Sequence, residues 1–127
     1  MSNNNLPFSK WRRAGGLVFL SGELPLGPDG AMPSGIEAQT RLTLQRIAAT
    51  LEGVGLALRD VVQVTVYLTH AEDFAAFNAV YQQHFTAPYP VRTTVVAPLV
   101  LPGARVEITV VAADSADAQP QSEVASR

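Results

Sequence analysis

Two apolar stripes at helical spacing predict two helices. The first predicts a helix over about residues 36–52; its members are Leu44, Ile47, Ala48 and Leu51. Gly53 and Gly55 follow it, and glycine readily adopts the left-handed conformation that ends a helix. The second stripe predicts a helix over about residues 71–85; its members are Phe74, Phe77, Val80, Tyr81 and Phe85.

Short apolar runs and alternating positions predict the strands. Residues 17–20 are an apolar run between glycine-containing turns, and residues 61–68 alternate between apolar and polar positions. The alternation places one set on a common face, namely Val62, Val64, Val66 and Leu68. Turn residues between positions 24 and 35 predict a hairpin to a second, irregular strand. Two further strands are predicted over residues 91–97 and 104–112. The order ββαβαββ predicts a single α+β domain with a mixed sheet.

Two helices cannot cover both faces of such a sheet, so we expect both on one face. The other face then carries apolar residues such as Val95, Ala97 and Val111, and a large apolar sheet face rarely stays exposed on a monomer. Charged residues make up only 16% of the chain, against about 25% in typical globular domains. Both observations predict a homo-oligomer.

The ends of the chain differ in composition from its middle. The 127 residues suffice for one domain, which we place at residues 6–113. Residues 114–127 contain one branched aliphatic residue and no aromatic one, a composition that does not offset the entropy of ordering. We therefore expect a disordered C-terminal tail over residues 114–127 and a flexible N-terminus over residues 1–5.

The charge and the cysteine content of the chain exclude several classes of function. The net charge is −2 and the pI about 5.6, which gives no electrostatic attraction for nucleic acid. The chain has no cysteine, so thiolate nucleophiles and zinc–thiolate sites are excluded. No apolar stretch approaches the roughly 20 residues of a membrane span, and no export signal is evident. We expect a cytoplasmic protein that binds neither nucleic acid nor membrane.

The sequence gives little support for a metal site or a catalytic triad. His70 and His84 are 14 positions apart, which matches no metal-ligand spacing. Ser21 precedes Gly22, but no glycine stands at the spacing of a nucleophile elbow. We predict no bound metal.

Arg92 and Glu107 are the most informative charged pair. Arg92 opens a predicted strand, and by alternation it shares a face with Thr94. Glu107 stands in the middle of another strand, where charged groups are seldom buried unless paired. One interpretation is a structural Arg–Glu pair at an oligomer interface. The other is a site in which Arg92 binds a substrate carboxylate and Glu107 handles a water molecule. Spacing alone favours the structural pair.

Five segments in order resemble the RidA/YjgF family of reactive-imine deaminases, also labelled endoribonuclease L-PSP. They are residues 17–22, 60–69, 73–81, 90–95 and 101–108. The resemblance extends over about residues 7–112 and preserves the spacing between Arg92 and Glu107. It implies a fold similar to chorismate mutase, a homotrimer with inward-facing sheets, and a cleft between each pair of subunits.

The resemblance also implies roles for individual residues. Arg92 binds the carboxylate of a 2-imino or 2-enamino acid, which its planar fork engages bidentately. Glu107 positions or activates the attacking water, and the products are a 2-keto acid and ammonia, without a cofactor. The pocket is completed by Ser21, Gly22, Thr94 and Asn78, with Phe8 as a further substrate-binding residue.

The chain departs from the family pattern at several positions. Phe8 stands where many active members have tyrosine, Glu23 where glutamine is common, and Thr94 where cysteine is frequent. These departures leave a second hypothesis open, in which a trimer binds small carboxylates such as keto acids without turnover. The family label also suggests an endoribonuclease, but the acidic pI and the lack of a histidine pair or basic stripe argue against it.

Overall fold

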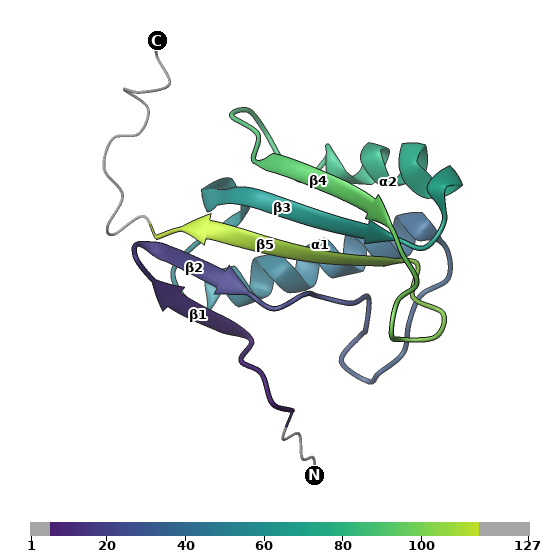
Figure 1. The fold of residues 1–127 in the computed structure, drawn as a ribbon, viewed down its shortest axis with the longest axis horizontal. Coiled ribbons are helices and arrows are strands. Elements are labelled where there is room, and N and C mark those ends of the chain that lie inside the picture. The colour runs from purple at the N-terminus through teal and green to yellow at the C-terminus, as the bar shows by residue number, and fades with distance from the viewer. Residues whose placement is uncertain (1–5, 115–127) are drawn as a thin grey trace.

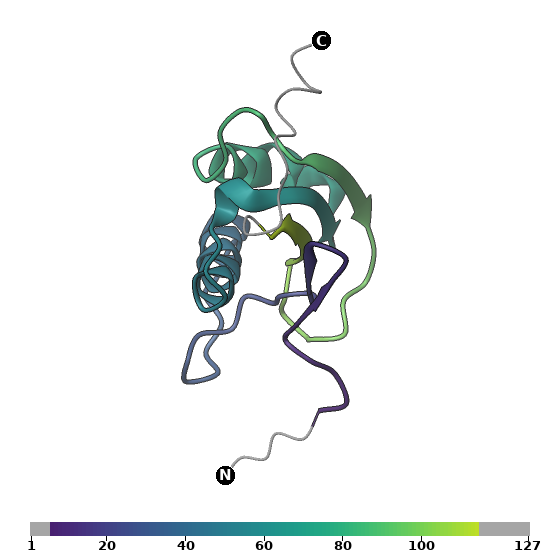
Figure 2. The ribbon, with the colours of Figure 1, turned by 90° about the vertical axis from the view of Figure 1, so that its left-hand side faces the viewer.

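The computed structural model describes residues 6–114, which form a five-stranded sheet with both helices on one side (Figures 1 and 2). The strands are β1 (Trp11–Ala14), β2 (Leu17–Leu20), β3 (Val61–Leu68), β4 (Val91–Val96) and β5 (Val106–Ala113). The helices are α1 (Ile36–Glu52) and α2 (Phe74–Tyr81), with short 3₁₀ turns η1 (Leu58–Asp60) and η2 (Ala71–Asp73). The sheet order is β1-β2-β5-β3-β4, in which only β3 and β4 are parallel. The predicted α+β class, the mixed sheet and the one-sided helices are confirmed.

The first hairpin differs from the prediction. The partner of β2 is β1, which precedes it, and the two are joined at Gly15 and Gly16, with φ of 59° and 77°. Two positive φ values suit the tight turns of β-hairpins. The prediction of a strand between positions 24 and 35 is wrong. No strand forms there, and the segment only follows a single bridge between Glu23 and Ile108. The sequence of β1 lacks apolar alternation, so the glycine turn that follows it is its one sequence signal for a strand.

The second helix is shorter than predicted. It is preceded by η2 and ends at Tyr81, where the chain tightens into i to i−3 hydrogen bonds at Gln83 and His84. Phe85 nevertheless packs in the core, which explains why the apolar stripe extends past the helix. At the other helix, Gly55 has a φ of 83° and follows the end of α1, as predicted.

A register shift in β3 changes which valine is buried. The pairing with β5 is irregular between Val61 and Gln63, so Val61 is buried and Val62 is 43% exposed. The predicted placement of Val62 beside Val64 is therefore wrong. Beyond the shift, the predicted alternation holds through Leu68.

The core lies between the helices and one face of the sheet. Its largest fully buried side chains include Phe77, Leu44, Ile47, Leu51, Leu68 and Ile108. The strand register places Phe19, Val111, Tyr67, Val91 and Val95 on the opposite face, which no helix covers (Figure 2). Several of these side chains are exposed, Phe19 and Val91 among them. The apolar second face predicted from the strand pattern is confirmed.

Asp114, at the C-terminal end of the domain, is held against the first hairpin. Its backbone N–H donates to Gly16 and its carboxylate pairs with Arg13 at 2.6 Å, so this first residue of the predicted tail is anchored to the sheet. The remaining tail and the predicted flexible residues 1–5 lie outside the described residues. Between positions 6 and 114, no helix is long and apolar enough to cross a bilayer.

Candidate functional site

Arg92 lies among aromatic rings on the helix-covered side of the sheet. It pairs in register with the buried Val64, and α2 supplies the rings. The Arg92 guanidinium carbon lies 4.7 Å from the ring centroid of Tyr81, 5.4 Å from Phe77 and 5.8 Å from Phe74. These are cation–π distances. Within residues 6–114 no carboxylate lies at ion-pair distance from Arg92, so its donors are available to an anion.

Arg92 and Thr94 share a hollow of about 430 Å³ between β4 and the start of α2. Its wall includes Phe74 and Ala71. We define the arginine cluster as Arg92, Thr94, Phe74, Phe77 and Tyr81. Asn78 is half-buried on α2, one turn from Phe74, but it does not line this hollow. Of the predicted substrate-binding residues, the structure thus brings Arg92 and Thr94 together at this hollow and leaves Asn78 on the neighbouring helix.

Tyr81 is held neutral by its surroundings. Burial raises the pKa of Tyr81, and the Arg92 guanidinium partly offsets this effect. A neutral phenol ring presents its face to the cation, and it stacks on Phe85 with the centroids 4.5 Å apart. Tyr81 therefore orients Arg92 and does not compete as a base.

Glu107 lies on the other face of the sheet, directly opposite Tyr67 of β3. A Cβ on Gly22 would collide with its carboxylate and would lie 3.2 Å from the Thr109 hydroxyl oxygen. Phe19 pairs with Val111 and Glu23 with Ile108, so three residues face two, as in a β-bulge. We define the glutamate cluster as Glu107, Gly22 and Thr109. The absence of a side chain at Gly22 gives the Glu107 carboxylate its place.

The pKa of Glu107 is raised. Burial is the larger cause, and the negative charge of Glu23 adds to it. A carboxyl whose pKa moves toward neutrality is suited to accept a proton and return it. The environment of Glu107 therefore fits general acid–base work.

The N-terminal segment packs beside Gly22. The Ser21 hydroxyl donates to the backbone carbonyl of Ser9 at 2.6 Å, and the backbone N–H of Ser21 donates to the carbonyl of Lys10. Phe8 is 61% exposed next to this contact. The structure thus gathers Ser21, Gly22 and the segment of Phe8 near Glu107, with the Ser21 hydroxyl engaged by backbone.

The two clusters do not meet within one chain. Arg92 is level with Val64 on β3, and Glu107 is level with Tyr67. They are therefore about 10 Å apart along the strands and about 10 Å apart across them, with the sheet between their side chains. The Arg–Glu pair considered from the sequence does not form inside the subunit.

Several residues around the site were missed at the level of sequence. The apolar stripe of α2 predicted only core packing, although Phe74 and Tyr81 also contact Arg92. The ion pair of Glu23 with Arg46, 2.6 Å between Nε and Oε2, joins positions 23 residues apart. Neither residue carried a signal of pairing, because the contact depends on how α1 packs.

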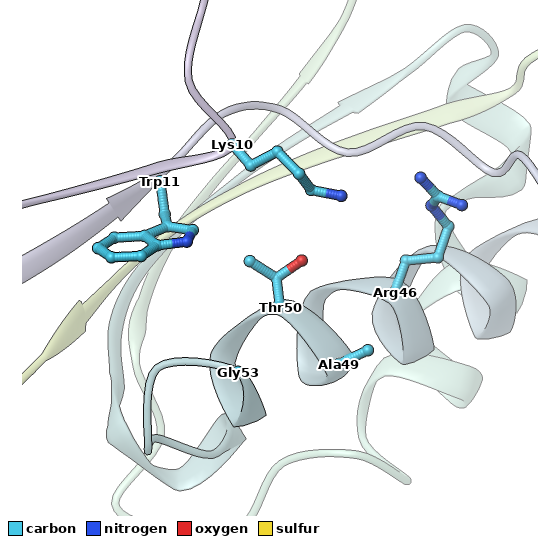
Figure 3. Close-up of a pocket in the computed structure, with 6 residues that line it drawn as sticks. All are labelled: Lys10, Trp11, Arg46, Ala49, Thr50 and Gly53. Atoms are coloured by element: carbon cyan, nitrogen blue, oxygen red, sulfur yellow. The ribbon is translucent and has the colours of Figure 1, made fainter. Parts of the chain in front are cut away.

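Figure 3 shows a second hollow, of about 380 Å³, between α1 and the residues that lead into β1. Lys10 and Arg46 reach toward it from opposite sides, and the Trp11 ring forms part of its wall. It is separate from the hollow beside Arg92. In the described range of the chain, no group of three or more His, Asp or Glu side chains is arranged to hold a metal ion.

Comparison with known proteins agrees with the fold. The family model described as Endoribonuclease L-PSP matches residues 3–114. The mitochondrial protein mmf2 of Schizosaccharomyces pombe is 39% identical over 111 residues, which cover 85% of this chain and 88% of the relative. The 2-iminobutanoate/2-iminopropanoate deaminase of Escherichia coli K12 is 32% identical over 110 residues, which cover 84% of this chain and 86% of the relative.

A solved structure adds a ligand-bound relative. The crystal structure of E. coli TdcF with bound serine matches with a TM-score of 0.80 and 31% identity, covering 87% of this chain and 90% of that one. A mitochondrial relative stands among the matches, so the cytoplasmic location stays a prediction. The fold and the family match agree over nearly the whole domain. The chain therefore belongs to the endoribonuclease L-PSP family, the RidA/YjgF family that its five sequence segments resemble.

Proposed function

We propose that this protein hydrolyses 2-imino and 2-enamino acids to 2-keto acids and ammonia. Arg92 binds the substrate carboxylate and Glu107 handles the water. The observation that carries the proposal is the Arg92 guanidinium, held by three rings at 4.7–5.8 Å beside a hollow and without a carboxylate partner in residues 6–114. A guanidinium in that setting is suited to bidentate binding of a planar carboxylate.

The relatives support this class of substrate. One relative is named a 2-iminobutanoate/2-iminopropanoate deaminase, and TdcF was crystallised with serine, an amino acid whose carboxylate resembles that of an imino acid. Both kinds of molecule carry a carboxylate next to a carbon that bears nitrogen. The hollow beside Arg92 and Thr94, about 430 Å³, falls within the usual volume of small-molecule sites, roughly 300–1,000 Å³.

We further propose a homotrimer in which Arg92 of one subunit meets Glu107 of the next. The uncovered sheet face carries exposed apolar side chains such as Phe19 and Val95, which a second copy would bury. Because the arginine and glutamate clusters lie on opposite faces, one subunit supplies each cluster to a different interface. A closed ring of three head-to-tail contacts then contains three equivalent sites.

The proposed chemistry uses Glu107 twice. The Glu107 carboxylate takes a proton from water as the water oxygen bonds to the carbon of the protonated imine, and the π electrons move to nitrogen, which becomes a neutral amino group. The protonated Glu107 then donates to the amino nitrogen, the C–N bond breaks with its electron pair on nitrogen, and ammonia leaves. The hydroxyl proton is released as the keto acid forms. Such general acid–base help contributes roughly 10²–10⁴-fold.

The test is hydrolysis of 2-imino acids generated in situ by an amino-acid oxidase. The wild type should accelerate imine loss over buffer, and Arg92→Ala should abolish the acceleration. Arg59→Ala, at an exposed arginine on η1, serves as the matched control and should behave as the wild type. No acceleration by the wild type, or equal acceleration by Arg92→Ala, would contradict the proposal.

One observation favours a second candidate, a trimer that binds keto acids without turnover. Phe8 lacks the hydroxyl found in the family pattern, its side chain is 61% exposed, and the next residue, Ser9, accepts a hydrogen bond from the Ser21 hydroxyl. Calorimetry with a 2-keto acid separates the candidates. Binding that requires Arg92, in a protein that does not accelerate imine loss, would select the binding function.

A further inference from the structure

Arg105 joins several segments at the end of the sheet where β3 and β4 finish and β5 begins (Figure 1). Its guanidinium binds the Asp73 carboxylate twice: Nε donates to Oδ2 at 2.9 Å, and Nη2 donates to Oδ1 at 3.0 Å. Its backbone carbonyl accepts a hydrogen bond from the N–H of Thr69 at 3.1 Å. Arg105 therefore ties the residues just after β3 and the 3₁₀ turn η2 to the start of β5.

The Asp73 carboxylate is held in one orientation. The residue is buried, and its own backbone N–H donates to the carbonyl of His70 at 3.0 Å. A bidentate pair between guanidinium and carboxylate fixes the angle between the two groups as well as their distance. Asp73 therefore cannot shift without breaking two charge-assisted hydrogen bonds.

Gln39 supports Arg105 from the side of α1. Its Oε1 accepts from the backbone N–H of Arg105 at 2.7 Å, and its Nε2 donates to the carbonyls of Pro33 and Gly103, both at 3.0 Å. Gln39 is buried, and both donors and the acceptor of its amide are engaged. The backbone at Arg105 is therefore fixed by a buried side chain. We define the Arg105 clamp as Arg105, Asp73 and Gln39.

The Arg105 clamp holds positions that adjoin the hollow beside Arg92. Asp73 directly precedes one residue that lines this hollow, and Thr69 directly follows another. The apolar residues of the hollow in these two segments are Leu68, Ala71 and Phe74. A ligand whose carboxylate is bound by Arg92 therefore meets, with its side chain, an apolar wall that the clamp keeps in place.

We infer that Arg105 is a positioning residue: by clamping Asp73 it fixes the apolar wall of the hollow beside Arg92, and so favours imino acids with an extended apolar side chain. The inference rests on the proposed function, because it takes that hollow as the substrate site. Contact with a fixed wall matters for selectivity, since one methylene in an apolar pocket changes kcat/KM by roughly 10–200-fold.

The first test is selectivity between two substrates generated in situ by an amino-acid oxidase. The measure is the ratio of kcat/KM for the imine of leucine to that for the imine of alanine. Arg105→Gln removes the paired donors and the charge but keeps the backbone hydrogen bonds. We expect the ratio to fall by about 10-fold or more. A smaller folded fraction lowers both rates equally and leaves the ratio unchanged, so an unchanged ratio in Arg105→Gln overturns the inference.

Arg13→Gln is the matched control. Arg13 pairs with Asp114 at 2.6 Å just past the other end of β5, and these side chains are 44% and 10% exposed, against 38% and 9% for Arg105 and Asp73. We expect the wild-type ratio in Arg13→Gln, and an equal fall there contradicts the inference. Asp73→Asn should lower the ratio as Arg105→Gln does. The double substitution should lower it no further, because both changes break the same contact.

The second test separates the inference from the proposed function. 2-Keto acids carry the same carboxylate and side chain, so calorimetry with 4-methyl-2-oxopentanoate and with pyruvate gives an affinity ratio that needs no turnover. We expect the preference for the longer acid to fall in Arg105→Gln and to persist in Arg13→Gln. If the wild type binds these acids without hydrolysing imines, the deaminase proposal fails and the affinity ratio decides the role of Arg105. A wild type that neither hydrolyses imines nor binds keto acids overturns both.

Discussion

Arg92 and Glu107 lie on opposite faces of one sheet, with Arg92 level with Val64 and Glu107 level with Tyr67. Arg92 points among the rings of α2, whereas the register with Tyr67 puts Glu107 on the opposite face, which no helix covers (Figure 2). A reaction that needs both side chains at one substrate therefore needs two subunits. The placement of these residues links the proposed activity to the proposed assembly.

Gly22→Ala tests the space that the Glu107 carboxylate occupies. The new methyl group would collide with that carboxylate and displace it by about 1 Å, a misplacement that costs on the order of 100-fold in rate. We expect a folded protein with kcat for imine hydrolysis lowered by about that factor. Gly53→Ala is the control, since its Cβ would meet only α1 carbonyls at 3.3 Å or more. Equal rates for the two variants would show that Gly22 has no role at the site.

Replacement of Tyr81 tests how Arg92 is oriented. Tyr81→Leu removes the ring that lies 4.7 Å from the guanidinium, and a cation–π contact contributes about 0.5–2 kcal/mol. We expect KM to rise about 2-fold to 30-fold, with a smaller change in kcat, because the ring positions a binding group. Tyr81→Phe keeps the ring and should retain a KM near that of the wild type. Similar KM values for the leucine and phenylalanine variants would contradict this role.

The raised pKa of Glu107 predicts a pH-dependent effect on stability. Burial and the charge of Glu23 disfavour ionised Glu107 in the folded protein, so stability is lost as the pH rises from the ordinary value of 4.5 through the folded-state pKa. Glu107→Gln removes that loss. We expect its Tm to exceed that of the wild type at about pH 7 and to match it at about pH 3, where both states are protonated. A gain that is equal at both pH values would contradict the shift.

Much of the fold follows from local patterns in the sequence. The stripe around Leu44 and Ile47 identifies α1, and alternation identifies β3, because those residues face one core. Trp11–Ala14 was missed as a strand, since its four residues are exposed and only the glycine turn brings it to β2. Val62 was misplaced because a register shift in pairing is a property of two strands.

The candidate site was less accessible to sequence than the fold. Alternation correctly put Arg92 and Thr94 on one face. It did not reveal that Glu107 belongs to the other face, since that depends on the register of β5 against β3. The rings around Arg92 looked like core positions, and Glu23 meets Arg46 only through the packing of α1. Contacts between distant segments require the tertiary structure.

The most direct test of the account is complementation between Arg92→Ala and Glu107→Ala chains. Each variant alone should be inactive, because every site lacks one residue. When the two are co-expressed and assemble at random in a closed ring, about a quarter of the sites receive an intact Arg92 and an intact Glu107 from different subunits. Co-expression of Arg92→Ala with the doubly substituted chain restores no site and is the control. We expect the mixed assembly to hydrolyse imines at about a quarter of the wild-type rate. Inactivity of that mixed assembly, when the wild type is active, would contradict a site shared between subunits.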